Sequence, residues 1–130
     1  MKKLLISALL VIIFIGIFTL YTVYTENKLI NKITLEKMDI TSLKDGTYIG
    51  QYNTKMIDVE VSVTIKTSLI TDITILKHHN GKGAKAEIIL ESVVDKNSLE
   101  VDIISGATAS SKVILKAIEQ ALLEARRESL

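Results

Sequence analysis

The sequence predicts an α+β fold: a small antiparallel sheet packed by two helices, preceded by one N-terminal transmembrane helix. Three patterns support this prediction. The chain carries no charge from residue 4 to 25, alternates apolar and polar side chains over residues 56–66, and repeats apolar residues at helical spacing over 110–127. A chain of 130 residues has room for one domain beyond an anchor. We therefore expect an anchor over residues 1–25, a stalk over 26–44 and a domain over 45–130.

The N-terminal segment is the most apolar part of the chain. Lys2 and Lys3 precede an apolar run from Leu4 to Leu20, and the next charged residue is Glu26. A helix needs about 20 apolar residues to cross the hydrocarbon layer of a bilayer. The run therefore predicts a membrane-spanning helix. The paired lysines favour an N-terminus on the inner side, and Lys28, Lys32 and Lys37 on the other flank reduce this bias.

A cleaved signal peptide is the alternative interpretation of this segment. Its cleavage site would need small residues, but residues 19–24 contain neither alanine nor glycine. Tyr21 and Tyr24 instead suit the headgroup interface at the end of a spanning helix. We therefore predict an uncleaved anchor. Residues 25–44 mix apolar and polar side chains irregularly and suggest a stalk that includes, at most, a short helix.

Three strands are predicted after the Asp45-Gly46 turn. Residues 47–52 are rich in strand formers, and residues 56–66 alternate so regularly that one face must meet a core. Residues 66–69 should form a turn, although it lacks the glycine that such turns favour, and residues 70–77 should return as a partner strand. The apolar set of the central strand is Ile57, Val59, Val61, Val63 and Ile65, alternating with Asp58, Glu60, Ser62 and Thr64.

Helical periodicity replaces alternation in the last third of the chain. Residues 78–83 form a polar loop that contains glycine, residues 84–95 predict a helix, and residues 99–104 are apolar enough for a short inner strand. Residues 110–127 predict the last helix. Its apolar stripe consists of Val113, Ile114, Ala117, Ile118, Ala121 and Leu122.

The turn before this last helix is small and rich in hydroxyls. Residues 105–111 read Ser-Gly-Ala-Thr-Ala-Ser-Ser, and Asp102 stands three residues before the first serine. The hydroxyls of Thr108, Ser110 or Ser111 are placed to cap the first helical turn. A phosphate can also approach the backbone closely at such a turn. The residues alone leave both interpretations open.

The string Asp102-x-x-Ser105-Gly106-Ala107-Thr108 resembles the flavinylation signature of the FMN-binding domain family. Five specified residues are present, and Ser110-Ser111-Lys112 resembles the continuation of that signature. The resemblance extends over nearly everything from Asp45 onward. Its further parts are the opening strand at 45–50, the hairpin at 56–66 and 70–76, and the loop and helix start at 79–83 and 86–87.

The resemblance implies a role for each residue of the signature. Thr108 would accept FMN through a phosphoester bond between its hydroxyl oxygen and the flavin phosphate. A separate magnesium-dependent flavin transferase, with FAD as donor, would form that bond. Asp102, Ser105, Gly106 and Ala107 would be recognised by the transferase and shape the turn.

The polar loop supplies further candidates for contact with FMN. His78, His79, Gly81 and Gly83 are placed to face the flavin ring or its phosphate, while a simple connecting loop is an equal alternative. The adjacent histidines do not predict a metal site, because neighbours on a strand point to opposite faces and the sequence contains neither cysteine nor another histidine.

The resemblance thus implies a membrane-anchored extracytoplasmic flavoprotein that relays electrons, with a quinone-linked membrane reductase or other redox proteins as partners. Related domains occur in the sodium-pumping quinone reductase and in membrane-bound electron-transfer complexes. The alternatives are noncovalent FMN binding and an adapter module without flavin. Electron relay is favoured over a stand-alone enzyme because we identify no pocket for a small substrate in the sequence.

Composition excludes several other classes of function. The absence of cysteine excludes disulfides, thiolate metal sites and thiol nucleophiles. A net charge of +1 without a basic stripe argues against nucleic acid as a partner. Gly81–Lys85 does not match a phosphate-binding P-loop, and Ala109 replaces the serine that a Ser-x-x-Lys hydrolase would need before Lys112.

Overall fold

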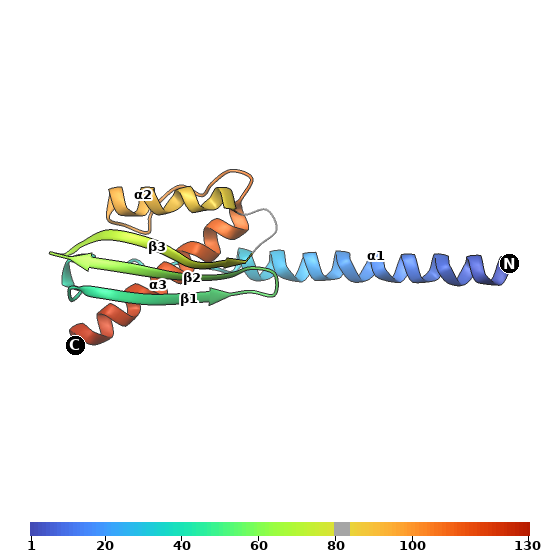
Figure 1. Ribbon diagram of the computed structural model, residues 1–130, viewed down its shortest axis with the longest axis horizontal. Helices are drawn as coiled ribbons and strands as arrows, with labels where there is room; N and C mark the ends of the chain where they lie inside the picture. The colour runs from blue at the N-terminus through green and yellow to red at the C-terminus, as the bar shows by residue number, and fades with distance from the viewer. Residues whose placement is uncertain (80–83) are drawn as a thin grey trace.

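The structure, a computed structural model, describes residues 1–79 and 84–130 (Figure 1). A long helix leads into a three-stranded antiparallel sheet with helices packed against it, which confirms the α+β prediction. In chain order the elements are α1 (Lys2–Asn31), the 3-10 turn η1 (Ile40–Ser42), β1 (Gly46–Asn53), β2 (Asp58–Lys66), β3 (Leu69–His79), the 3-10 helix η2 (Ala84–Ile88), α2 (Ile89–Lys96) and α3 (Thr108–Ser129).

Helix α1 projects away from the rest of the molecule, and its N-terminus is far from the sheet (Figure 1). Within the described residues it is long and apolar enough to cross a membrane, a property shared by anchors and signal sequences. Its serine and threonine hydroxyl groups are satisfied inside the helix. Ser7, Thr19 and Thr22 each donate to the backbone oxygen three residues earlier, at 2.8 Å. The outer surface of this helix therefore suits an apolar surrounding.

The sheet has the order β1-β2-β3, with both neighbouring pairs antiparallel. One face is buried under the helices, and the other is in contact with water, as the alternating pattern predicted. Residues of α2 and α3 join the buried face in one continuous core. The apolar residues that β2 and the position before it contribute are Ile57, Val59, Val61, Val63 and Ile65, all buried.

The turn between β2 and β3 is tight despite having no glycine. Thr67 and Ser68 adopt positive φ angles of 51° and 64°, the left-handed conformation that a type I′ hairpin turn needs at both central positions. Long-range hydrogen bonds hold it, two of them to the segment before β1. The Thr67 N–H donates to Asp45 Oδ2 at 3.0 Å, and Ser68 Oγ donates to the Thr41 backbone oxygen at 3.1 Å. Tertiary contacts thus compensate for the missing glycine.

Strand β3 is irregular in a way that reorients its last residues. Glu60 pairs with Lys77 while Val61 pairs with Ile75, so Leu76 is an extra residue in the ladder. Such a bulge shifts which side chains face the core beyond it. His78, rather than Lys77, consequently points to the covered side, where its side chain is 4% exposed.

Helix α3 lies very close to β1, and Gly50 makes this approach feasible. A Cβ atom added at Gly50 would lie 2.0 Å from the Ala117 backbone oxygen and 2.4 Å from the Ala121 backbone nitrogen. No side chain fits there. The predicted apolar stripe of α3 is buried over its whole length: Val113, Ile114, Ala117, Ile118, Ala121 and Leu122.

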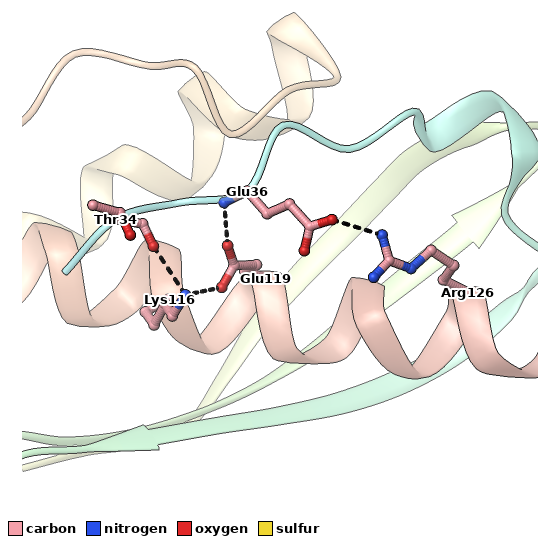
Figure 2. A network of polar contacts seen from close by, with 5 residues as sticks. All are labelled: Thr34, Glu36, Lys116, Glu119 and Arg126. Atoms are coloured by element: carbon pink, nitrogen blue, oxygen red, sulfur yellow. Dashed lines mark hydrogen bonds and ion pairs between the residues drawn. The ribbon is translucent and has the colours of Figure 1, made fainter.

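The segment after α1 runs along α3 and is fastened to it by a polar network (Figure 2). Glu119, only 1% exposed, accepts the backbone N–H of Glu36 and forms an ion pair with Lys116. Lys116 Nζ also donates to the Thr34 backbone oxygen at 2.9 Å, and Arg126 Nη1 lies 2.9 Å from Glu36 Oε1. Residues 32–44, expected as part of a stalk, thereby pack against the domain.

Two predicted elements differ from the structure in extent. The single helix expected over residues 84–95 is divided into η2 and α2, and it ends at Asn97, whose φ is 48°. The last helix begins at Thr108, two residues earlier than predicted. Its start thus includes the threonine of the signature.

The inner strand predicted for residues 99–104 was wrong. These residues form no strand and run as irregular chain between α2 and α3. Their backbone donors find other partners: the Val101 N–H donates to the Leu99 oxygen at 2.9 Å, and the Ile104 N–H donates to Ser111 Oγ at 3.3 Å. The apolar character of residues 99–104 could not reveal that these bonds take the place of hydrogen bonds to a neighbouring strand.

Candidate functional site

The start of α3 lies at the end of the domain that adjoins α1, which we call the proximal end. Lys112 Nζ lies 3.5 Å from the Ile30 backbone oxygen of α1. The turn between β1 and β2 is at the same end, where the Met56 N–H donates to Glu26 Oε1 of α1 at 3.2 Å. Three segments far apart in sequence therefore meet around α3's first turn.

A glycine-dependent turn leads into the helix. Ser105 and Gly106 form the turn, and the Ala107 N–H donates to the Ile104 oxygen at 3.0 Å. Gly106 has a φ of +77°, which residues with a side chain rarely adopt. Ser105 and Gly106 are exposed, Asp102 is exposed three residues earlier, and Ala107 is buried.

The prediction that Thr108, Ser110 or Ser111 caps this helix was wrong. Ala107 occupies the N-cap position, and within the described part of the chain no side chain caps the helix. Ser111 turns inward instead: its Oγ donates to the Ala107 oxygen at 2.8 Å and accepts from the Ile104 N–H. The hydroxyl of Ser111 stabilises the turn from inside rather than capping from outside.

Thr108 is the one exposed hydroxyl residue in the first turn of α3 that the structure describes. Ser110 is 5% exposed and Ser111 is fully buried, whereas Thr108 is exposed. The free N–H groups of an uncapped helix start carry partial positive charge. An exposed hydroxyl thus lies beside donors that favour an anion.

Lys85 adds a full positive charge near the same turn. A Cβ atom at Gly106 would lie 3.4 Å from Lys85 Nζ, so this ammonium group reaches the turn from η2. Among the residues described, no carboxylate forms an ion pair with Lys85. The sequence analysis missed this residue, because nothing local distinguishes it from other surface lysines.

The histidines predicted as ligand contacts lie in different environments. His78 Nδ1 is 2.7 Å from Glu87 Oε1, in a contact that joins β3 to η2. His79 is the exposed last residue of β3. Gly81 and Gly83 fall in residues 80–83, outside the described part of the chain.

The residues present suit a phosphate-bearing cofactor. An exposed hydroxyl, uncapped helix N–H groups and a lysine without an ion pair among the described residues together favour a phosphate ester. A profile described as the FMN-binding domain matches residues 52–123, more than half of the chain and from the end of β1 through most of α3. The chain therefore belongs to the FMN-binding domain family, and family membership implies a flavin cofactor.

Proposed function

We propose that this protein is a membrane-anchored extracytoplasmic flavoprotein that carries FMN covalently on Thr108 and relays electrons. The observation that supports attachment at this position is the exposure of Thr108, since the neighbouring serines are buried. Family membership supports FMN as the cofactor. Electron transfer follows from the chemistry of FMN, which accepts one or two electrons.

Attachment would proceed by phosphoryl transfer to the threonine. The Thr108 oxygen forms a bond to the FMN phosphorus of FAD, the bond from that phosphorus to the AMP moiety breaks, and AMP leaves. The hydroxyl proton passes to a base of the magnesium-dependent flavin transferase that we propose as partner. Ser105 and Gly106 are exposed beside Thr108 and so are accessible to such an enzyme.

The chain's own residues would then hold the phosphodiester. The N–H groups of α3's first turn and the Lys85 ammonium face its negative charge, and Gly106 keeps space free beside them. Ser111 maintains the turn through its two backbone hydrogen bonds. We propose a quinone-linked membrane reductase or another redox protein as electron partner.

A comparison of variants tests covalent attachment. The full chain is co-expressed with a flavin transferase, and flavin fluorescence is recorded in a denaturing gel together with the intact mass. We expect fluorescence and a mass increase of one FMN less one water. Thr108→Val should abolish both, while Thr71→Val, at an exposed threonine of β3, should retain both.

Other outcomes identify the alternatives. Fluorescence that persists in Thr108→Val would place the attachment elsewhere and contradict the proposal. Flavin that copurifies but is released by denaturation would indicate noncovalent FMN binding. Protein without any flavin would favour an adapter module.

A further inference from the structure

The elements of the domain run between two opposite ends, and their hydrogen bonds identify which residues lie at each end. At the proximal end, β1 turns into β2 at residues 54–57, and Asp58 of β2 pairs with His79 at the end of β3. Helix α3 also starts there and finishes at the far end, where Ser129 Oγ accepts the Lys44 N–H at 2.7 Å.

The far end, which we call the distal end, is formed by the opposite termini of the same elements. It contains the turn at Thr67 and Ser68, and Asn97 at the end of α2 donates to the Ser68 oxygen through its side chain at 3.4 Å. Strand β3, with 11 residues, spans about 36 Å between the two ends at about 3.3 Å per residue. Figure 1 shows α1 leaving the molecule at the proximal end.

Helix α1 is joined to the proximal end without a flexible linker. It continues unbroken to Asn31, and its last two turns are part of the folded domain: Glu26 is 3% exposed and Ile30 is 4% exposed. Glu26 accepts the Met56 N–H, and Ile30 accepts from Lys112. The orientation of the domain therefore follows that of the helix.

With α1 spanning the bilayer as proposed above, on which this inference rests, helix geometry places the proximal end within the headgroup layer. From Leu4 to Val23 a helix spans about 30 Å, the thickness of the hydrocarbon core. Glu26 follows about 4.5 Å later along the axis, and the headgroup layer extends about 5–8 Å beyond the core on each side. Met56, bonded to Glu26 and 55% exposed, thus lies level with the headgroups.

The charges at the proximal end suit an anionic surface. Among the described residues, the exposed or partly exposed lysines at this end are Lys28, Lys32, Lys55, Lys77, Lys85 and Lys112. Among the acidic groups at this end, Asp58 pairs with Lys77 and Glu87 contacts His78. Glu26 is buried: its Oε1 accepts the Met56 N–H, while its Oε2 has no hydrogen-bond partner among the described residues. Glu60 is partly exposed and Asp102 is exposed. Basic residues beside a membrane segment are attracted to anionic lipid.

We infer that the proximal end, including the start of α3 with Thr108, rests against the headgroups of an anionic lipid bilayer. A group bound at Thr108 is then held at the membrane surface. Where the proposed function also holds, the flavin exchanges electrons with a lipid-dissolved carrier of the quinone class rather than with a partner at the distal end. The placement itself does not depend on flavin.

Energy transfer to labelled lipids tests this placement. Because the sequence contains no cysteine, each introduced cysteine is the only thiol that a dye can label. Single cysteines are introduced as Thr108→Cys, Ser105→Cys and Met56→Cys at the proximal end and as Ser68→Cys at the distal end. Each full-length chain, expressed without a flavin transferase, is labelled with a donor dye and reconstituted into vesicles whose headgroups carry an acceptor.

We expect severalfold stronger energy transfer from positions 56, 105 and 108 than from position 68. Replacing anionic with zwitterionic lipid should weaken transfer at position 56. Equal transfer from both ends, or stronger transfer from position 68, would overturn the placement, and insensitivity to lipid charge would overturn the anionic preference. Because no flavin is used, failure here is distinguishable from failure of Thr108 to accept FMN.

Discussion

Gly50 is the position where a single added methyl group should matter most. Its Cβ would collide with backbone atoms of Ala117 and Ala121, which cannot move aside by changing rotamer. We expect Gly50→Ala to lower the free energy of unfolding by about 3 kcal/mol, at the upper end of overpacking costs. Denaturant unfolding of the full chain in detergent, followed by circular dichroism, measures this.

The adjacent residue provides a matched control for this substitution. Ile49 is 59% exposed on the uncovered face of the sheet, so Ile49→Ala should change the free energy of unfolding by less than about 0.5 kcal/mol. Equal effects at both positions would show that α3 does not approach β1 as closely as described.

Asp58 and Lys77 form a cross-strand ion pair that should make stability depend on acid pH. The hydrogen bond from Lys77 lowers the pKa of the Asp58 carboxyl below its ordinary value of 3.8. A lowered folded-state pKa contributes stability above the unfolded pKa, and this contribution is lost as the pH falls through the folded pKa.

We therefore expect wild type to be more stable than Asp58→Asn by an amount that is constant between about pH 5 and 8 and shrinks below about pH 4. Urea unfolding across this range measures the difference. A difference that grows in acid would contradict the assigned ion pair. Because both side chains reach solvent, added salt should also reduce it.

Among the elements, the segment after α1 depends on one buried carboxylate for its place along α3. Glu119→Ala would leave the Glu36 N–H without its acceptor and Lys116 without its ion-pair partner. We expect a loss of about 2 kcal/mol in the free energy of unfolding, the range for hydrogen bonds to charged groups. Faster hydrogen exchange at Glu36 should accompany it.

Glu124 on the same helix is the control for this change. It forms an exposed ion pair with Arg127 at 2.9 Å, and exposed helical pairs contribute about 0.3–0.5 kcal/mol. Glu124→Ala should therefore have little effect on stability and none on exchange at Glu36. If both glutamates behaved alike, the network in Figure 2 would not be what holds the segment.

The elements also differ in how well local patterns predict them. The alternation of β2 and the stripe of α3 were confirmed because each buries one face of a regular element, and burial imposes its period on the residues. Residues 99–104 are as apolar as a strand, yet their N–H groups bond to Leu99 and Ser111. A local sequence pattern does not indicate which acceptor a backbone N–H group will bond to.

Over the whole molecule, α1 should be retained in the mature protein. Its last turns are buried against the domain through Glu26 and Ile30, so cleavage in the middle of this helix would separate its apolar part from a packed one. We expect the intact mass of protein from the membrane fraction to include residues 1–25. Detergent, but not high salt or alkaline carbonate, should extract it.

A mature protein that begins near residue 25 would instead identify a signal sequence. It would also remove the basis for holding the proximal end at the membrane. A variant with a stronger cleavage site, Tyr21→Ala and Val23→Ala, makes the comparison sharper, because small residues at these spacings favour processing. Release of the double variant from the membrane, with the wild-type protein retained there, would confirm that the natural segment is an anchor.

The periodicity of side chains predicted the strands and the last helix, and the uncharged apolar run predicted the N-terminal helix. The signature with Thr108 was identified by its resemblance to a known family. These features are local, since a buried face repeats every second residue in a strand and every third or fourth in a helix. Long-range contacts alone established that Lys85 reaches Gly106, that Ser110 and Ser111 are buried, and that the signature adjoins α1. Such contacts join residues that are far apart in the sequence. The residues flanking each one do not indicate its partner, because tertiary packing determines which two residues meet.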